Sequence, residues 1–303
     1  MSVPDAAVLG ERYRTLGVPV RGGDLRVAVW EADRADAPTV LAVHGITSSH
    51  LAWPQVAALL PDVRVVAPDL RGRGRSRDLP GPYGMPTHAD DVATVLDHLG
   101  VERAVALGHS MGAFVSLVLA DRRPELVSAL VLVDGGMPLL PPPGVAPGQM
   151  AQAVLGPAAD RLRRTFADRA AYQEFWREHP AMGPYWSALT TAYVDYDLVG
   201  EEPELRPATT VGALEEDIRE LVDGDSLLRA LGRLRHPTSW LLAPRGLLDE
   251  VPPLYPDTAR DHWAAEHPGV VIADLADVNH YTVVMGAEGA RQVVPWVRRA
   301  LEI

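Results

Sequence analysis

The sequence predicts an α/β fold in which a mostly parallel sheet is flanked by helices. Short runs rich in β-branched residues alternate with amphipathic runs, which is typical of repeated strand–helix–strand units. Several short runs, such as Leu41–Val43 (LAV), are apolar throughout, as expected for strands buried on both faces of a parallel sheet. The chain of 303 residues is long enough to bury a core without disulfide or metal support.

Seven short runs are predicted to be strands. In chain order they are Leu25–Trp30, Thr39–Val43, Val63–Ala67, Ala104–Leu107, Ala129–Val133, Ser239–Ala243 and Val270–Ala273. Between them, helices are predicted at Trp53–Leu60, Thr87–Leu99 and Met111–Asp121. These helices supply the crossover connections that parallel strands require.

The regular alternation stops at Met137, where a proline-rich stretch covers residues 138–147. From about Gln149 to Leu234 the pattern is helical without a strand signal, and strands resume at Thr238. We therefore predict a core formed by residues 1–137 and 235–303, with residues 138–234 inserted as a helical cap. Eight of the 18 aromatic residues lie between positions 166 and 196. They either pack a small core within the cap or face a substrate.

Composition excludes several function classes. The formal net charge of −12 opposes binding to nucleic acid or to an anionic membrane surface. The chain contains no cysteine, and all 28 basic residues are arginine, which excludes thiolate and lysine chemistry. No apolar stretch is long enough to span a bilayer, and the first 14 residues do not resemble a secretory signal, so a cytoplasmic location is expected.

The sequence Gly108-His-Ser-Met-Gly112 follows a predicted strand and opens a predicted helix. In this G-x-S-x-G context a tight turn exposes the serine, here Ser110, at the N-terminus of the helix. The small flanking glycines let neighbouring backbone pass closely. The helix dipole at that position favours developing negative charge. Ser110 is therefore the candidate nucleophile.

The chain resembles cap-containing α/β-hydrolases of the serine esterase and lactonase type. The resemblance rests on the G-x-S-x-G turn, on residues 44–47 (HGIT), on residues 67–76 (APDLRGRGRS) and on residues 279–281 (NHY). These landmarks extend over nearly the whole chain. The family resemblance implies an α/β-hydrolase fold with a Ser–His–acid catalytic triad and no cofactor or metal.

A base is needed to take the proton of a serine hydroxyl, and histidine suits this task near neutral pH. His280 follows the last predicted strand by a loop, where the resemblance places the base. Two acids remain candidates. Asp134 ends a predicted strand, whereas Asp249 lies in the loop after Ser239–Ala243 but about three residues later than many relatives place it. We favour Asp134 and keep Asp249 as the alternative.

The resemblance also implies an oxyanion hole formed by the backbone N–H groups of Ile46 and Met111. Thr47 and Ser48 are expected to be ordinary loop residues that could add a hydroxyl contact. Candidate substrate-binding residues are His44 and four cap aromatics: Trp176, Tyr185, Trp186 and Tyr193.

Two charged segments have ordinary structural interpretations. The four arginines between Arg71 and Arg77 lie where the family carries a glycine-rich loop, so we do not interpret them as a nucleic-acid patch. The acidic run Glu215-Glu216-Asp217 is predicted to be a solvated helix face.

Together these observations predict a serine hydrolase that cleaves a carboxylic ester or lactone of an apolar or aromatic small molecule through an acyl-enzyme. Carbon–carbon bond hydrolysis, cofactor-free haloperoxidation and acyl transfer remain alternatives on the same triad. A small-molecule receptor with slow or no turnover is a further alternative, because fold and triad do not fix turnover. The oligomeric state is not predicted.

Overall fold

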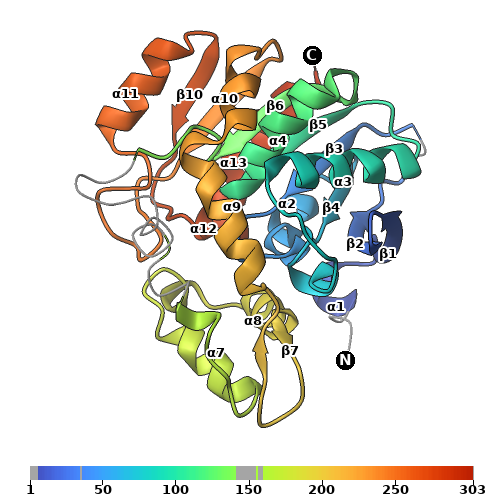
Figure 1. The fold of residues 1–303 in the computed structure, drawn as a ribbon, viewed down its shortest axis with the longest axis vertical. Coiled ribbons are helices and arrows are strands. Elements are labelled where there is room, and N and C mark those ends of the chain that lie inside the picture. Colours follow the sequence, from blue (N-terminus) through green and yellow to red (C-terminus); the bar gives the residue numbers. More distant parts are fainter. Residues whose placement is uncertain (1–5, 35, 141–154, 156–159, 303) are drawn as a thin grey trace.

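An eight-stranded sheet runs through the centre of the molecule, with helices on both faces (Figure 1). The computed structural model describes residues 6–34, 36–140, 155 and 160–302. The strands are β1 (Tyr13–Val20), β2 (Gly23–Trp30), β3 (Thr39–Val43), β4 (Arg64–Pro68), β5 (Ala104–His109), β6 (Val127–Val133), β9 (Thr238–Leu242) and β10 (Val270–Asp274).

The strand order is β1-β2-β4-β3-β5-β6-β9-β10. From β4 to β10 all neighbours pair in parallel, while β2 joins β1 and β4 antiparallel. The carboxyl ends of β3, β5 and β6 therefore lie at one edge of the sheet, which is where open parallel sheets carry their sites. The predicted fold class, a mostly parallel sheet with flanking helices, is confirmed.

The helices form one layer on each face of the sheet. One face is covered by α3 (Met85–His98), α4 (Met111–Arg122), α9 (Val211–Asp223), α10 (Asp225–Gly232) and α11 (Asp257–Glu266). The other face is covered by α2 (Pro54–Ala58), α12 (Thr282–Met285) and α13 (Ala287–Leu301). A short helix α1 (Ala6–Leu9) precedes β1. All residues of β3 and β5 are buried between the two layers.

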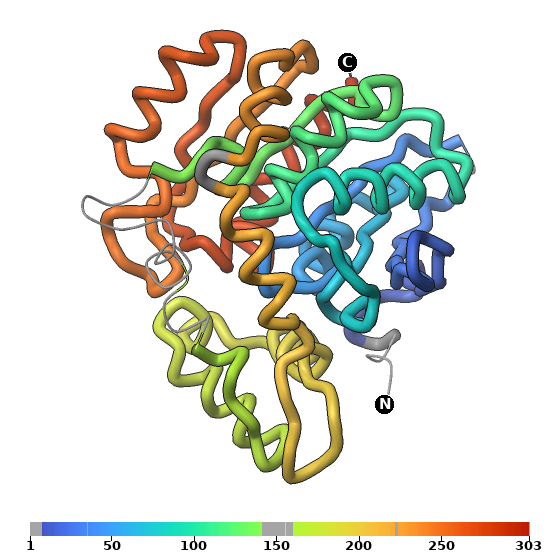
Figure 2. The backbone as a smooth tube through the Cα atoms, in the orientation of Figure 1, coloured from blue at the N-terminus to red at the C-terminus, as the bar shows by residue number. Residues whose placement is uncertain are grey.

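Between β6 and β9 the chain leaves the sheet and returns to it (Figure 2). It forms α7 (Arg169–Arg177), α8 (Ala188–Tyr196) and the two-residue strands β7 (Leu198–Val199) and β8 (Arg206–Pro207) at the lower end of the view. Here Tyr172, Trp176 and Tyr193 share one apolar cluster, which also includes Leu9, Leu51 and Tyr281 from outside the segment. By contrast, α9 and α10 pack with α3 and α4 on the main core. The assignment of residues 138–234 to one inserted cap therefore remains a prediction.

Several predicted elements differ from the structure. The sequence pattern missed β1, and the expectation of no strands between residues 149 and 234 was wrong because β7 pairs with β8. The predicted helix Trp53–Leu60 corresponds to α2, which is shorter at both ends and is preceded by a 3₁₀ turn at His50–Ala52. The other predicted strands and helices are present with ends shifted by a few residues. Most of the proline-rich stretch 138–147 lies outside the described residues.

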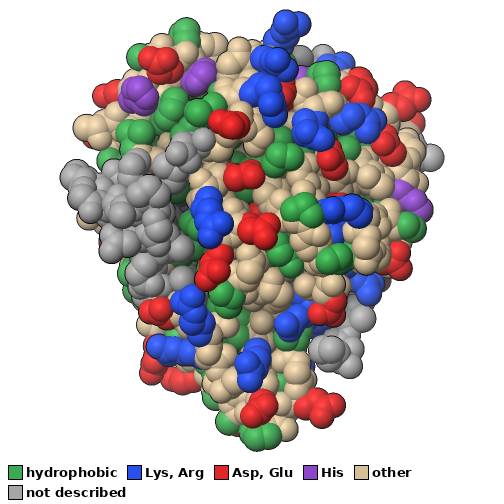
Figure 3. All heavy atoms as spheres, in the orientation of Figure 1, with side chains coloured by type: hydrophobic (Ala, Val, Ile, Leu, Met, Phe, Trp, Pro, Cys, Tyr) green, Lys and Arg blue, Asp and Glu red, His purple; other side chains and the backbone are tan. Residues whose placement is uncertain are grey.

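Charged side chains of both signs are interspersed on the face shown in Figure 3, without a large basic area. None of the helices in the described part of the chain is both long and apolar enough to cross a bilayer.

Candidate active site

Ser110 lies in the turn between β5 and α4 with a φ of 53° and a ψ of −126°. A positive φ is a strained conformation for a residue with a side chain. The two flanking glycines make the turn sterically feasible. A Cβ at Gly108 would lie 2.4 Å from Ala113 Cα, and a Cβ at Gly112 would lie 1.9 Å from the Val43 carbonyl oxygen. The G-x-S-x-G sequence therefore folds into the tight strand-to-helix turn that its pattern predicts.

His280 lies in the loop after β10, and its Nδ1–H donates a hydrogen bond to Asp134 Oδ2 at 2.7 Å. Asp134 directly follows β6 and is completely buried, and its other oxygen accepts from Ala243 N–H at 3.3 Å. The next residue, Gly135, packs so closely that a Cβ there would lie 2.2 Å from the Ser110 carbonyl oxygen. The structure thus places Ser110 after β5, Asp134 after β6 and His280 after β10, with the His280 ring bonded to Asp134.

Asp249, the alternative acid, lies elsewhere in the same region. Its Oδ1 accepts hydrogen bonds from Arg245 Nε at 2.7 Å and from Asn279 Nδ2 at 2.9 Å. These two donors lower the pKa of Asp249 despite its partial burial, which acts in the opposite direction. Asp249 therefore contacts the residue before His280, while the imidazole ring is bonded to Asp134.

The two predicted oxyanion donors belong to segments that meet at Ser110. Met111 begins α4, and Ile46 follows Gly45 at the end of β3. A Cβ at Gly45 would lie only 3.1 Å from Ser110 Cβ, so the absence of a side chain permits this approach. The backbone N–H groups of Ile46 and Met111 have no acceptor within the described residues. Free, closely placed N–H groups are suited to stabilising a developing oxyanion.

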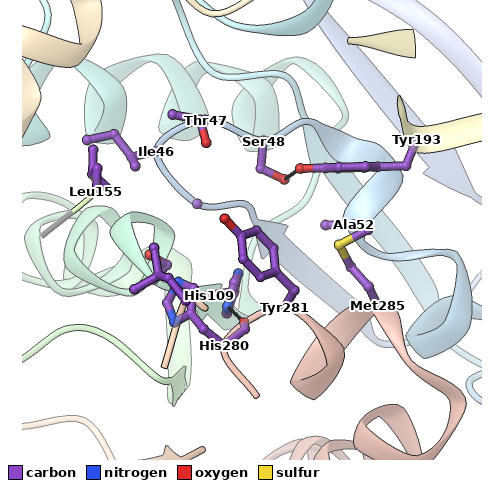
Figure 4. A pocket seen from close by; sticks show the side chains of 13 residues that line it. Ile46, Thr47, Ser48, Ala52, His109, Leu155, Tyr193, His280, Tyr281 and Met285 are labelled. Carbon is purple, nitrogen blue, oxygen red and sulfur yellow. Dashed lines mark hydrogen bonds between the residues drawn. The ribbon is translucent and has the colours of Figure 1, made fainter. Parts of the chain in front are cut away.

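Ser110 and His280 line one pocket. Figure 4 shows this pocket from close by, with His280 among the labelled residues. Its walls combine the loop after β3 with residues from α8, α12 and the loops after β5, β9 and β10. Besides these two residues, the lining consists of Gly45, Ile46, Thr47, Ser48, Ala52, His109, Leu155, Tyr193, Leu247, Tyr281 and Met285. Apolar side chains predominate in this set.

Among the five predicted substrate-binding residues, Tyr193 lines this pocket. Its hydroxyl points at Ser48 and donates a hydrogen bond to Ser48 Oγ at 3.1 Å (Figure 4). Burial raises the pKa of Tyr193, so the hydroxyl stays protonated at neutral pH. Thr47 and Ser48, which were expected to be ordinary loop residues, also line the pocket. Tyr281 and Met285 were missed, although both lie close to His280 in the sequence.

The other four predicted substrate-binding residues do not line the pocket that the described residues form. His44 is fully buried, and both its ring nitrogens are bonded to backbone. Trp176 packs against Tyr172 and His179 inside the α7–α8 cluster. Tyr185 and Trp186 lie near the surface: the Tyr185 hydroxyl accepts from Arg245, and Trp186 Nε1 donates to Thr191 Oγ1.

The imidazoles around Ser110 differ in their environment. Burial lowers the pKa of His44 to about 4, so this ring is neutral at physiological pH. Burial and the neighbouring His280 also hold the pKa of His109 well below its usual range. His109 Nε2–H donates to the His280 carbonyl at 2.8 Å, which ties the strand before Ser110 to the loop that carries His280. His44 and His109 are therefore neutral at physiological pH.

One of the two charged segments differs from its predicted role. Asp217 is buried and bonded, so the acidic run Glu215-Glu216-Asp217 is not wholly a solvated face. Arg71 and Arg73 are also buried, each paired with a carboxylate. Across residues 6–34, 36–140, 155 and 160–302, no three His, Asp or Glu side chains come close enough to hold a metal ion.

A family model described as "alpha/beta hydrolase fold" matches residues 38–203. RutD from Rhizobium rhizogenes, provisionally named a carbamate hydrolase, is 39% identical over 104 residues, which are 34% of this chain and 40% of RutD. Lipase LipV from Mycobacterium tuberculosis is 39% identical over 100 residues, which are 33% of this chain and 38% of LipV. The chain thus matches about two-fifths of the length of these curated relatives.

Solved structures are similar over nearly the whole chain. E-2-(acetamidomethylene)succinate hydrolase superposes with a TM-score of 0.76 at 20% identity, covering 96% of this chain and 100% of that one. A thioesterase domain from the curacin biosynthetic pathway superposes with a TM-score of 0.72 at 21% identity, covering 94% and 99%. At these identities the likeness concerns the fold.

Proposed function

The chain belongs to the alpha/beta hydrolase fold family, and on this premise we propose that it is a serine hydrolase of carboxylic esters or lactones. Ser110 is the nucleophile, His280 the base and Asp134 the acid. The substrate is an apolar small molecule, and the reaction passes through an acyl-enzyme on Ser110. No cofactor takes part in this proposal.

One observation carries the proposal. Ser110 occupies a strained turn at the start of α4 and shares a pocket with His280, whose Nδ1–H is bonded to the buried Asp134 at 2.7 Å. That bond holds the ring in the tautomer that leaves Nε2 free to accept a proton. A buried carboxylate also stabilises the imidazolium that forms when the proton arrives.

The reaction follows from this arrangement. Ser110 Oγ attacks the carbonyl carbon of the substrate while its proton passes to His280 Nε2. The carbonyl oxygen becomes an oxyanion that accepts hydrogen bonds from the N–H groups of Ile46 and Met111. Collapse of this intermediate expels the alcohol, which takes the proton from His280. Water then repeats the sequence on the acyl-enzyme, releasing the acid and restoring Ser110.

The substrate class follows from the pocket lining. Ile46, Leu155, Leu247 and Met285 present apolar side chains to the pocket. The Tyr193 hydroxyl is the polar group contributed by α8, and it is already bonded to Ser48. Apolar walls with few polar groups favour an uncharged acyl or alcohol portion. The names of the relatives, a lipase and a thioesterase domain among them, agree with acyl transfer in general.

The test is hydrolysis of p-nitrophenyl esters of increasing acyl length. The wild type should show Ser110-dependent turnover, with an initial burst of p-nitrophenol on esters whose acyl-enzyme is hydrolysed more slowly than it forms. Ser110→Ala should lose about 10³-fold or more in kcat. Ser116→Ala is the matched control, because Ser116 lies on the same helix, bonded to the Gly112 carbonyl, away from the pocket.

A fluorophosphonate probe provides a second readout. It should label the peptide containing Ser110 in the wild type and in Ser116→Ala, but not in Ser110→Ala. A wild type that is labelled yet inert on every ester and lactone would overturn the ester proposal and favour carbon–carbon bond hydrolysis or acyl transfer. Tight ligand binding without turnover would instead favour a receptor.

A further inference from the structure

Arg73 is a charged side chain that is completely buried between the sheet edge and α9. Its Nε–H donates to the Ile46 carbonyl at 2.9 Å, and its Nη1–H donates to the Arg71 carbonyl at 2.9 Å. Its Nη2 is 2.5 Å from Asp217 Oδ2 and 3.9 Å from Met111 Sδ. Arg73 therefore touches both residues whose N–H groups are proposed as oxyanion donors.

The peptide groups on both sides of the Ile46 Cα are held by buried side chains. His44 Nδ1–H donates to the Gly45 carbonyl at 2.7 Å. Because C=O and N–H of a planar trans peptide point in opposite directions, this bond sets the direction of the Ile46 N–H. Arg73 holds the next carbonyl along the chain, that of Ile46 itself. Loss of the Arg73 side chain would release the Ile46–Thr47 peptide group and would make the adjoining Gly45–Ile46 peptide group less firmly held.

Asp217, the partner of Arg73, comes from α9 and is itself firmly held. It accepts from Gly84 N–H at 2.6 Å and from His88 Nε2–H at 3.1 Å. Burial alone would raise its pKa, but Arg73 and His88 lower the pKa of Asp217 to about 2. The carboxylate is therefore charged at neutral pH and gives Arg73 a fixed counter-ion.

We propose that Arg73 is a positioning residue for the oxyanion hole and that Asp217 of α9 holds Arg73 in place. The inference rests on the proposed function, since it assigns a role around the donor Ile46. In this arrangement the docking of α9 on the core sets the orientation of a catalytic peptide more than 100 residues away in sequence. Misplacing such a donor by a fraction of an ångström weakens transition-state stabilisation more than substrate binding.

The chain offers a matched control on the same loop. Arg71 is also fully buried, and it forms a two-pronged ion pair with Asp91 of α3, at 2.9 and 2.8 Å. Its remaining donor, Nη1, is bonded to the Pro80 carbonyl at 2.7 Å. The Arg71 side chain makes no hydrogen bond to Ile46 or Met111. Both arginines thus anchor the loop after β4, but Arg73 alone bonds to the Ile46 carbonyl.

The experiment compares Arg73→Met with Arg71→Met, and Arg73→Lys with Arg71→Lys. Both positions should lose similar stability in urea unfolding. The Arg73 variants should lose roughly tenfold to a hundredfold in kcat on a p-nitrophenyl ester, with KM changed less than about twofold. The Arg71 variants should keep kcat within about twofold. The lysine pair decides the question if the methionine variants do not fold, because lysine retains a charge for the buried carboxylate.

A second readout separates this inference from the proposed function. In ¹⁵N–¹H spectra, the amide of Ile46 should shift in Arg73→Lys and stay in place in Arg71→Lys, whatever the substrate is. Equal kcat losses at both arginines, or an unmoved Ile46 amide in Arg73→Lys, would overturn the positioning role. Absence of Ser110-dependent turnover in the wild type would instead overturn the proposed function, leaving the amide shifts to decide the positioning role.

Discussion

Asp134 has a positive φ of 45°, which is uncommon for a residue with a side chain. Its backbone N–H donates to the Leu241 carbonyl at 2.8 Å, so β9 fixes the turn that follows β6. The carboxylate thereby faces His280 Nδ1 from a buried position. The strained backbone at Asp134 therefore occurs where it directs the Asp134 carboxyl group toward the candidate base.

Asp134→Asn should reduce kcat by roughly 10³–10⁴-fold, because an amide cannot stabilise the imidazolium and favours the wrong tautomer. Asp249→Asn is the matched control, since Asp249 is bonded to Asn279 beside His280 but not to the ring. It should reduce kcat less than about tenfold. Steady-state kinetics on a p-nitrophenyl ester measure both. A larger loss at Asp249 would show that the acid has been assigned to the wrong strand.

Sequence patterns alone could identify Ser110 and could suggest His280, since both stand in local motifs. They could not choose between Asp134 and Asp249, because each ends or follows a strand and the choice depends on which side chain meets the imidazole. Arg73 gave no such signal: its partner Asp217 lies on a distant helix, in an acidic run typical of solvated faces. Long-range buried ion pairs leave no local pattern.

At the scale of elements, the β5–α4 turn depends on the close approach of three backbones. Gly112 in the first turn of α4 lies against the end of β3, where a Cβ would meet the Val43 carbonyl oxygen at 1.9 Å. The clash is with backbone, so no side-chain rotation can relieve it. The loop after β3 carries Gly45 and Ile46, which means that any shift of β3 would reach the proposed oxyanion hole.

Gly112→Ala should therefore destabilise the protein by about 3 kcal/mol or more, through overpacking against β3. Gly212→Ala is the control: it lies in α9 with nothing within 4 Å of the added Cβ, and alanine there should be neutral or stabilise by up to about 1 kcal/mol. Urea unfolding monitored by circular dichroism measures both. Equal stabilities of the two variants would contradict the packing argument.

The strands that the sequence pattern did not predict went unrecognised for related physical reasons. In β1 only Val18 is buried, and the strand contains Gly17 and Pro19, so its hydrophobic alternation is weak. It is held at the sheet edge by backbone pairing with β2, which the side-chain pattern does not reveal. The strands β7 and β8 are two residues long, below the length at which any period can be recognised. Strands of the buried centre were predicted because burial on both faces imposes apolar composition.

For the molecule as a whole, buried histidines determine how stability depends on pH. Burial lowers the pKa of His44 to about 4, and burial with the nearby Arg161 lowers the pKa of His179 to about 4. Both values lie below the ordinary histidine pKa of about 6.5. Between pH 6.5 and 4 the unfolded chain therefore binds protons that the folded chain does not. The contribution of these two histidines to the free energy of unfolding is fully present above pH 6.5 and is lost as the pH falls toward 4.

The free energy of unfolding should accordingly fall between pH 7 and pH 4.5, with His44 alone contributing on the order of 2 kcal/mol. The lowered pKa of Asp217 also stabilises the folded state. This stabilisation is lost only below the ordinary aspartate pKa of about 3.9, which is outside the pH range tested. Urea unfolding at pH 7, 6, 5 and 4.5 measures the slope. His44→Asn should reduce the slope, whereas His262→Asn, at an exposed position, should not. A stability that is constant or rises on acidification would contradict this account.

The three proposed reacting side chains follow β5, β6 and β10, and none comes from the segment that carries α7 and α8. That segment meets the site through Tyr193, whose hydroxyl bonds to Ser48, and through the Ala181 carbonyl, which accepts a hydrogen bond from Asn279 Nδ2 at 3.1 Å. If α7 and α8 swing outward, the Asp134–His280 pair and the Ser110 turn stay assembled on the sheet. Such a movement would change which substrates can enter and how fast product leaves, while the reacting side chains would keep their arrangement. We therefore expect substrate entry and the chemical step to be separable in this fold. Exchanging the α7–α8 segment should change which substrates are accepted while the reacting side chains keep their places.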